Sequence, residues 1–357
     1  MNIFITGNMG YIGGSVVQQL RLSYPEAVLT GYDTGYFSEC TTGDFPELFL
    51  DKQYFGDIRN VPLELLADVD AIVHLAAISN DPMGNAYEKI TLEINYQASI
   101  DLARKAKQSG VKSFVFASSC SVYGEADNAM RSEKSPVNPL TAYAKSKVLA
   151  EQELEALANK NFKVTCLRFP TASGMSKRLR LDLVLNDFVA AALTEKKITI
   201  LSDGSPWRPL INVKDMGLAI DWALSRSAQE DFLLINVGSE SANYRVLDLA
   251  HAVTQIIPGV EIAVNPNALP DKRSYKVDFS HFKLVVPEVY QPQYDLTTTI
   301  TELKSGLEAL NFQDKSFRQS SLMRLNHLNQ LRKKNFIDGD LFWSSPNFPG
   351  GGSGLPK

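Results

Sequence analysis

A glycine-rich turn near the start of the chain constrains the fold more than any other feature. The run N-I-F-I has the apolar, β-branched character of a buried strand, and T-G-N-M-G-Y-I-G follows it, with Gly7, Gly10 and Gly13 evenly spaced. Such glycines serve where a strand turns sharply into a helix, where backbone approaches a phosphate, and where helix packs closely on strand. Phosphate groups would meet the positive end of the helix dipole. The pattern therefore predicts a dinucleotide site, and the structural alternative is a glycine-rich turn without a ligand.

Apolar runs and helical stretches alternate through the first half of the chain. We expect strands at residues 3–6, 28–32, 71–75, 113–118 and 164–169, and helices near residues 11–22, 86–108 and 141–159. Continuous apolar strands that alternate with helices are typical of a parallel sheet covered on both faces. The fold class that we predict is α/β: a doubly wound parallel sheet (Rossmann) with a smaller C-terminal substrate-binding lobe.

The pattern changes after residue 170, which suggests three segments. Residues 1–170 form the predicted NAD-binding domain, to which some later segments return. Residues 171–335 form the predicted substrate-binding lobe, with a late amphipathic helix at residues 318–334. Residues 336–357 are a tail rich in Gly and Pro, which we expect to be flexible.

Bulk properties exclude several classes of protein. The net charge of −4 gives no reason to expect attraction to nucleic acid or to an anionic membrane. No apolar run approaches the ~18 residues of a membrane span, and strand residues begin where a signal peptide would stand. The three cysteines have no metal-ligand spacing and cannot all pair, so we expect no metal and a cytoplasmic location.

Two carboxylates extend the cofactor prediction. Asp33 lies at the end of the second strand, about 20 residues after the glycines, where a carboxylate binds the ribose hydroxyls and repels a 2′-phosphate. It therefore favours NAD over NADP, the alternative being a loop aspartate. Asp57, in G-D-I-R, could bind the adenine amino group or simply cap a helix. His74 is expected to be a packed core residue rather than a catalyst.

Tyr143 and Lys147 are the predicted catalytic pair. They are four residues apart in a predicted helix, so their side chains project in the same direction. A free phenol has a pKa of about 10, and a neighbouring ammonium lowers it. Ser119 follows a strand that ends at the ligand-binding edge of the sheet, where its hydroxyl could polarise a carbonyl or alcohol. We predict that Tyr143 moves a proton while NAD moves a hydride; the alternative is an ordinary exposed helix face.

These motifs together resemble the extended short-chain dehydrogenase/reductases of the NAD-dependent nucleotide-sugar epimerase/dehydratase family. The resemblance runs from residue 1 to about residue 290 and rests on T-G-x-x-G-x-x-G, D-I-R, H-L-A-A, S-S-C-S-V-Y-G and Y-A-K-S-K. It implies that Ser119, Tyr143 and Lys147 are catalytic and that Asn95 supports the site. It also implies a nucleotide-diphosphate sugar substrate and a homodimer formed through two long helices.

The predicted contacts follow from these motifs and from the resemblance. The NAD contacts are Gly7, Met9, Gly10, Tyr11, Ile12, Gly13, Asp33, Asp57, Ile58, Leu75, Ala76, Ala77, Asn95, Tyr143, Lys147 and Pro170. The substrate contacts are Ser79, Ser119, Thr171, Arg180, Asp182, Asn186, Arg208 and Arg273. Arg208 and Arg273 lie in segments similar to the family's phosphate-binding segments, although Pro209 and Asn212 replace its usual acid and histidine. Arg178 lies in the same loop as Arg180, and the alternative for each loop arginine is a solvated surface charge.

The motifs favour some reactions of the family over others. The family's 4,6-dehydratases carry an Asp-Glu pair where this chain has Cys120 and Ser121, so dehydration is disfavoured. No histidine is placed to partner Cys120 as in the 3,5-epimerising reductases. A 4-epimerisation through a 4-keto sugar is the favoured reaction, with 4-dehydrogenase or 4-ketoreductase activity as the alternative. The non-enzyme alternative is a dinucleotide-binding sensor or scaffold. These motifs specify neither the base nor the sugar.

Overall fold

A seven-stranded parallel sheet forms the centre of the molecule. The computed structural model describes residues 1–344 except 126–128, 227–229, 266, 267 and 269–272. The order across the sheet is β11 (Phe232–Asn236), β7 (Lys163–Phe169), β5 (Ser113–Ser119), β4 (Ala71–His74), β1 (Asn2–Thr6), β2 (Val28–Asp33) and β3 (Lys52–Phe55). The direction of strand order reverses between β1 and β4, which creates the crevice where such sheets bind ligands.

Helices cover both faces of this sheet. On one face, α1 (Gly13–Ser23) and α7 (Val213–Ser225) pack over an apolar core that includes Ile3, Val73 and Val115. On the other face, α4 (Ala98–Gln108) and α5 (Ala142–Leu157) cover the opposite side chains of the same strands, such as Phe4 and Phe114. The predicted doubly wound α/β fold is therefore confirmed, and the predicted first-half strands agree with those observed to within one residue at each end.

The long helix expected at residues 86–108 is interrupted. Two short helices, α2 (Asp81–Ala86) and α3 (Glu88–Leu92), are followed by one turn of π-helix (Glu93–Gln97) and then by α4. A π-turn inserts an extra residue into a helix and is often found at functional sites. Here the turn contains Asn95, a predicted site residue.

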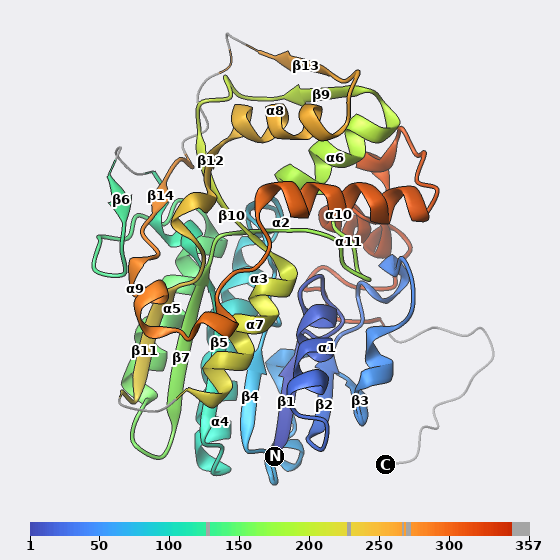
Figure 1. Ribbon diagram of the computed structural model, residues 1–357. Coiled ribbons are helices and arrows are strands. Elements are labelled where there is room, and N and C mark those ends of the chain that lie inside the picture. The colour runs from blue at the N-terminus through green and yellow to red at the C-terminus, as the bar shows by residue number, and fades with distance from the viewer. Residues whose placement is uncertain (126–128, 227–229, 266–267, 269–272, 345–357) are drawn as a thin grey trace, which may run out of the picture.

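The second lobe lies above the carboxyl ends of the strands (Figure 1). Its apolar core is formed mainly by α6 (Val184–Thr194), α8 (Val246–Ile256) and α10 (Leu296–Ala309). Small sheets complete it: β12 (Asn243–Arg245), β10 (Trp207–Asn212) and β8 (Thr171–Ser173); β13 (Glu261–Val264) with β9 (Lys197–Ile200); and β14 (Lys276–Val277) with β6 (Met130–Arg131). The chain returns to the large sheet through α7, β11 and α9 (Ser280–Val285), so the two lobes are interleaved.

The late helix is shorter than expected from the leucine spacing. It is α11 (Arg324–Lys333), preceded by a short 3-10 helix (Phe317–Gln319). Arg318 donates to Asp187 on α6 and forms an ion pair with Glu195. These contacts hold the 3-10 helix against α6, so that it does not continue into α11. Leu328 and Leu331 are buried as the spacing predicted.

The segment after α11 is more ordered than expected. Residues 336–344 form a loop closed by a β-bridge between Ile337 and Trp343, and they pack on the NAD-binding domain. Leu341 is fully buried there. The flexible tail was thus placed too early, because buried contacts with distant residues hold this loop. Residues 345–357 lie outside the described residues. Within the described part of the chain, no helix is long and apolar enough to span a membrane.

Candidate active site

The glycine-rich turn has the close approaches that its spacing predicted. Gly7 adopts a φ of +73°, and a Cβ there would lie 2.5 Å from the Ala76 nitrogen. A Cβ on Gly13 would lie 2.3 Å from the Asn8 oxygen. At Gly10, by contrast, only the Gly7 oxygen lies within 4 Å of such a Cβ, at 3.1 Å. The first and third glycines are therefore required by packing, whereas the middle one leaves room for a ligand.

The surroundings of this turn fit the pyrophosphate of NAD. The N-terminus of α1 follows the turn, its first turn carries no acidic side chain, and Ile12 provides no side-chain cap. Its N–H groups and dipole are thus available to an anion. The neighbouring Tyr11 reaches the second lobe, where its hydroxyl donates to the Gly174 carbonyl at 2.6 Å.

Asp33 lies beside the turn at the end of β2. Its carboxylate accepts hydrogen bonds from the backbone N–H of Met9 at 3.0 Å and of Gly35 at 2.8 Å. Burial raises the pKa of Asp33, and these two hydrogen bonds act in the opposite direction. The carboxylate is therefore held at the point where the strand and the glycine-rich turn meet, which is where the sequence placed a ribose ligand.

Asp57 takes the structural role that the sequence left open as an alternative. It caps a short 3-10 helix (Ile58–Asn60), accepting from the Arg59 N–H at 2.8 Å. The Arg59 guanidinium also binds both of its carboxylate oxygens, at 2.9 and 2.6 Å. The Asp57 carboxylate is thus occupied by contacts within the protein. A nucleotide at this position would contact the backbone after β3 rather than this side chain.

The end of β4 supplies the backbone opposite Gly7. His74 is a buried core residue between Thr6 and Ser99, at 2.6 and 2.7 Å, and burial lowers its pKa to about 3. Leu75, Ala76 and Ala77 follow it. In the π-turn, Asn95 binds both backbone groups of Ile78, at 2.8 and 2.9 Å. Asn95 therefore fixes the loop after β4, through which it would act on the site.

Ser119 and Tyr143 meet at the carboxyl edge of the sheet. Ser119 ends β5 and caps the following 3-10 helix (Cys120–Tyr123), accepting from the Ser121 N–H at 3.2 Å. Tyr143 is in the first turn of α5, which Thr141 caps. Burial raises the pKa of Tyr143 to about 12, and a hydrogen bond with Ser119 acts against that rise. The end of β5 and the first turn of α5 thus bring the two hydroxyls together.

Lys147 lies one turn further along α5 and is buried. Its Nζ donates to the Ala117 carbonyl at 2.7 Å and lies 5.8 Å from the centre of the Tyr143 ring. Burial lowers the pKa of Lys147 to about 8. We expected Lys147 to bring the pKa of the Tyr143 phenol below its ordinary value. When the protein groups alone are considered, this expectation is wrong, because burial of Tyr143 outweighs the effect of the nearby charges.

A buried ion pair beneath Lys147 was not predicted from the sequence. Glu151, on the next turn of α5, binds the Arg168 guanidinium of β7 at 2.9 and 2.6 Å, and both side chains are about 5% exposed or less. Ser118 donates to the same carboxylate, and Arg168 donates to Tyr123 at 3.0 Å. The only feature of the sequence that indicated this pair was the position of two charged residues, Glu151 and Arg168, inside apolar segments.

The loop after β8 is buried. Arg178 and Arg180 in this loop are therefore not solvated surface charges, which was the alternative that the sequence left open. Arg180 binds both oxygens of Asp182, at 2.8 and 3.0 Å, and donates to Ser79 at 3.1 Å. Burial would raise the pKa of Asp182, but the Arg180 guanidinium lowers it below its ordinary value. Arg178 is fully buried and pairs with Glu47 at 2.9 Å.

The side-chain amide of Asn186 is occupied by hydrogen bonds within the protein, which a substrate contact would not require. It is fully buried on α6, and its amide donates to the Tyr11 hydroxyl at 3.0 Å and to the Arg180 carbonyl at 2.8 Å. Its oxygen accepts from the Gly174 N–H at 3.1 Å. Asn186 therefore joins the glycine-rich turn to the second lobe.

The remaining predicted substrate residues come from several elements. Arg208 is on β10 and donates to the Trp207 carbonyl at 2.9 Å. Arg273 pairs at 3.0 Å with Asp81, which also accepts from Thr141 at 2.6 Å. Arg273 is thereby connected to the cap of α5. Pro170 connects β7 to β8, of which Thr171 is the first residue.

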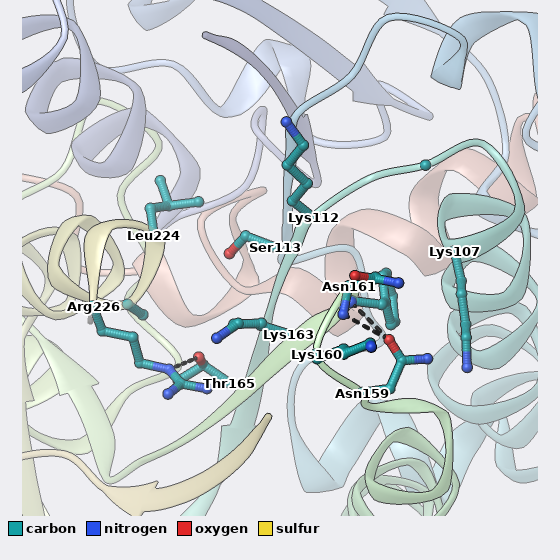
Figure 2. A pocket seen from close by; sticks show the side chains of 13 residues that line it. Lys107, Lys112, Ser113, Asn159, Lys160, Asn161, Lys163, Thr165, Leu224 and Arg226 are labelled. Carbon is teal, nitrogen blue, oxygen red and sulfur yellow. Dashed lines mark hydrogen bonds between the residues drawn. The ribbon is translucent and has the colours of Figure 1, made fainter. Parts of the chain in front are cut away.

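A cavity of about 680 Å³ lies away from all these residues, near the amino ends of β5 and β7 (Figure 2). Lys107, Lys112 and Lys163 line it together with Arg226, which donates to Thr165 at 2.7 Å. Ligands of such sheets bind at the carboxyl edge, and this cavity is at the opposite edge. We therefore do not assign it to the active site.

The fold and the arrangement of Ser119, Tyr143 and Lys147 define a dinucleotide-dependent oxidoreductase of the short-chain type. The family model described as "NAD dependent epimerase/dehydratase family" matches residues 3–238, and the chain belongs to this family. It is an NAD-dependent enzyme of the extended short-chain dehydrogenase type.

Similar proteins carry out different reactions. A UDP-glucose 4-epimerase of Lactobacillus helveticus is 26% identical over 280 residues, which cover 72% of this chain and 82% of that protein. UDP-glucuronic acid decarboxylase 3 of Arabidopsis thaliana is 26% identical over 300 residues, covering 80% and 83% of the two chains. The structure of UDP-glucuronic acid 4-epimerase from Bacillus cereus, with UDP-glucuronic acid and NAD, is 25% identical with a TM-score of 0.73, covering 87% of this chain and all of that one.

Proposed function

We propose that this enzyme interconverts the C4 epimers of a nucleotide-diphosphate sugar through a 4-keto intermediate. The observation that carries the proposal is that Ser119 and Tyr143, both partly exposed, meet near the buried Lys147, beside a glycine-rich turn that fits NAD. Bound NAD would supply the hydride chemistry at C4, namely oxidation of the alcohol to a ketone and reduction of the ketone from the other face. The similarity to 4-epimerases supports this choice of reaction.

The protein residues move the proton and hold the oxygen at C4. Tyr143 accepts the proton of the C4 hydroxyl as the alcohol becomes a ketone, and it returns the proton when the alcohol forms again. Ser119 donates a hydrogen bond to the same oxygen and keeps it close to the phenol. Since burial raises the pKa of Tyr143 to about 12, the phenolate needs a cation nearby. The Arg180 charge lowers this pKa, and the Lys147 ammonium lies 5.8 Å from the centre of the ring.

The substrate diphosphate is proposed to lie between the two lobes. Arg208 and Arg273 come from different elements of the second lobe, and a guanidinium suits paired phosphate oxygens. The buried Arg180–Asp182 pair is joined through Ser79 to the loop after β4. It is therefore placed to contact the sugar rather than the diphosphate.

The environment of Cys120 supports oxidation and reduction rather than dehydration. Its thiol is fully buried and donates to the Arg168 carbonyl at 3.3 Å, and burial raises its pKa. A group in that state does not exchange protons with a sugar. The alternative activities, 4-dehydrogenase and 4-ketoreductase, use the same three residues and differ only in whether the keto sugar leaves or enters.

Assembly and location belong to the proposal as well. A homodimer through the long helices α4 and α5 is proposed from the resemblance. Cys40, Cys120 and Cys166 are free thiols and form no disulfide with one another, and a reducing, cytoplasmic location is proposed from this cysteine usage.

The test is an assay of the purified enzyme with UDP, GDP, CDP and dTDP sugars, including UDP-glucose and UDP-glucuronic acid. An epimerase converts one sugar to its C4 epimer with no net reduction of NAD, and deuterium placed at C4 stays at C4. Reduction of NAD in step with substrate consumption would instead establish a dehydrogenase. Loss of CO₂ from UDP-glucuronic acid would establish a decarboxylase. Turnover of none of these sugars would contradict the proposal.

A further inference from the structure

The loop at residues 336–344, here called the C-terminal strap, lies against the ends of β2 and β3. Its bridge between Ile337 and Trp343 is reinforced by the Asp338 N–H, which donates to the Phe342 carbonyl at 2.9 Å. Leu341 is fully buried in the core on the α4 and α5 side of the sheet. The strap is therefore a folded part of the NAD-binding domain, although it is distant from that domain in sequence.

Contacts with the loops after β2 hold the strap in place. The Trp343 indole N–H donates to the Thr34 carbonyl at 2.7 Å, directly after the predicted ribose ligand Asp33. The Tyr36 hydroxyl donates to the Leu341 carbonyl, and its ring centre lies 5.6 Å from that of Trp343.

A second set of contacts comes from the loop after β3. Arg59, which holds Asp57, also donates to the Asp340 carbonyl at 2.8 Å. Its guanidinium carbon lies 3.5 Å from the centre of the Phe342 ring. The strap is thus attached to both loops that the sequence assigned to the adenosine half of NAD.

Between these two loops and the strap lies a cavity of about 370 Å³. It is lined by Thr34, Gly35, Ser38, Phe55, Gly56, Asp57 and Trp343. Phe55 and Trp343 are large aromatic residues that are 70% and 47% exposed, so both offer ring surface to a ligand. A flat aromatic base flanked by polar loop backbone suits this shape.

We propose that the C-terminal strap completes the NAD site, with the Trp343 indole forming one wall of the adenine pocket. This rests on the proposed position of NAD beside Asp33. Base–aromatic stacking favours binding by about 5- to 150-fold per ring, from its usual energy of 1–3 kcal/mol. The strap binds the adenosine half, far from the reacting carbon. It slows release of NAD, which suits an epimerase because the same NAD must serve both halves of each turnover.

The test measures binding of ADP-ribose, which has the adenosine half of NAD but no nicotinamide, by isothermal titration calorimetry of the full chain after bound nucleotide is removed. Trp343→Ala should weaken this binding about tenfold or more, and Trp343→Phe should restore most of it. The control is Phe336→Ala, which removes an exposed aromatic of the same strap that does not line the cavity. It should bind ADP-ribose as the unchanged protein does.

Asp33→Ala separates failure of this inference from failure of the cofactor placement. Weak binding in Asp33→Ala with unchanged binding in Trp343→Ala would overturn the role of the strap and leave NAD where it is proposed. Unchanged binding in both variants would overturn the placement of the adenosine half itself, and the inference with it. Circular dichroism of each variant shows whether the fold is retained. If Trp343→Ala does not fold, Trp343→Leu replaces it, and the same outcomes apply.

Discussion

Glu151 and Arg168 form a buried bidentate ion pair that joins α5, the helix of Tyr143 and Lys147, to β7, the neighbour of β5 in the large sheet. The carboxylate lies one helical turn beyond Lys147 and also accepts from Ser118, the residue before Ser119. Through Arg168 on β7 and Ser118 on β5, this carboxylate therefore fixes α5 relative to the strand that ends in Ser119. Since both groups are desolvated, either one alone would be a buried charge without a partner.

Glu151→Gln should destabilise the protein strongly. Removal of one partner from a buried ion pair typically costs about 3–5 kcal/mol, because the other charge stays buried. The free energy of unfolding, measured by urea denaturation, should fall by about that amount. The matched control is Glu261→Gln, which breaks the exposed pair with Lys197 and should cost less than about 1 kcal/mol. Equal small losses in both variants would show that Arg168 finds another partner.

Tyr143→Phe should remove activity while the enzyme keeps its NAD. General acid–base catalysis contributes about 10²–10⁴-fold to rate, so turnover should fall by at least that factor. NAD content, measured by nucleotide release from the purified protein, should stay unchanged. The control is Tyr87→Phe, which removes a phenol bound to Asn329 at 3.0 Å, outside the Ser119–Tyr143–Lys147 group. Substantial residual turnover in Tyr143→Phe would remove this residue from its role.

The sequence predicted the parts of the site that depend on local chain geometry. The glycine spacing implied close approaches that the structure shows at Gly7 and Gly13, and the four-residue spacing placed Tyr143 and Lys147 on one side of a helix. These predictions succeed because a turn and a helix impose short-range geometry on their own residues.

What the sequence did not reveal depends on contacts between distant segments. Arg178 resembles a surface charge until it is seen beside Glu47, from which it is separated by most of the N-terminal domain. Trp343 stands close to a stretch rich in Gly and Pro, and its contacts with Thr34 and Tyr36 connect it to the predicted cofactor site. The rise that burial causes in the pKa of Tyr143 was likewise not visible in the sequence, because spacing shows which charge is near but not how far the fold excludes water from the phenol.

Asp33→Ala should reduce the preference for NAD over NADP. The carboxylate is held by two backbone N–H groups at the end of β2, where it would repel a 2′-phosphate and bind ribose hydroxyls. Loss of a charged hydrogen bond costs about 1.5–3 kcal/mol, so the affinity for NAD should fall about tenfold or more. NADP should be affected less. Separate titrations with the two nucleotides measure the ratio, and an unchanged ratio would contradict the ribose assignment.

Cys120→Ala should leave the chemical step intact. The thiol is fully buried, bound to the Arg168 carbonyl, and its pKa is raised by burial, so it is not a proton donor or acceptor for the substrate. Turnover should stay within about threefold, far from the 10²–10⁴-fold loss expected for a general acid or base. Steady-state rates with the substrate that the sugar assay identifies check this. A loss of more than 100-fold would revive a role for Cys120 and weaken the case for a simple 4-epimerase.

Lys147→Met should make the protein inactive but more stable near neutral pH. Burial lowers the pKa of Lys147 to about 8 from its ordinary value of 10.5. Between pH 8 and pH 10.5 the lysine of the unfolded chain binds a proton that the folded protein lacks. The charged lysine therefore destabilises the fold in full below pH 8, and this cost disappears as the pH rises towards 10.5. A shift of one pKa unit corresponds to 1.36 kcal/mol, so the cost of the charged lysine is on the order of 3 kcal/mol. The variant removes this cost but also loses the hydrogen bond to the Ala117 carbonyl, which offsets about 1 kcal/mol of the stabilisation.

The measurement is urea denaturation of both proteins at pH 7 and pH 10, after bound nucleotide is removed. Lys147→Met should be more stable by about 2 kcal/mol at pH 7, and this advantage should shrink at pH 10 because the native lysine is then largely neutral. Lys145→Met, an exposed lysine on the same helix, should change stability by no more than about 0.5 kcal/mol. An advantage that is equal at both pH values would mean that better packing of methionine, and not loss of a buried charge, stabilises the variant.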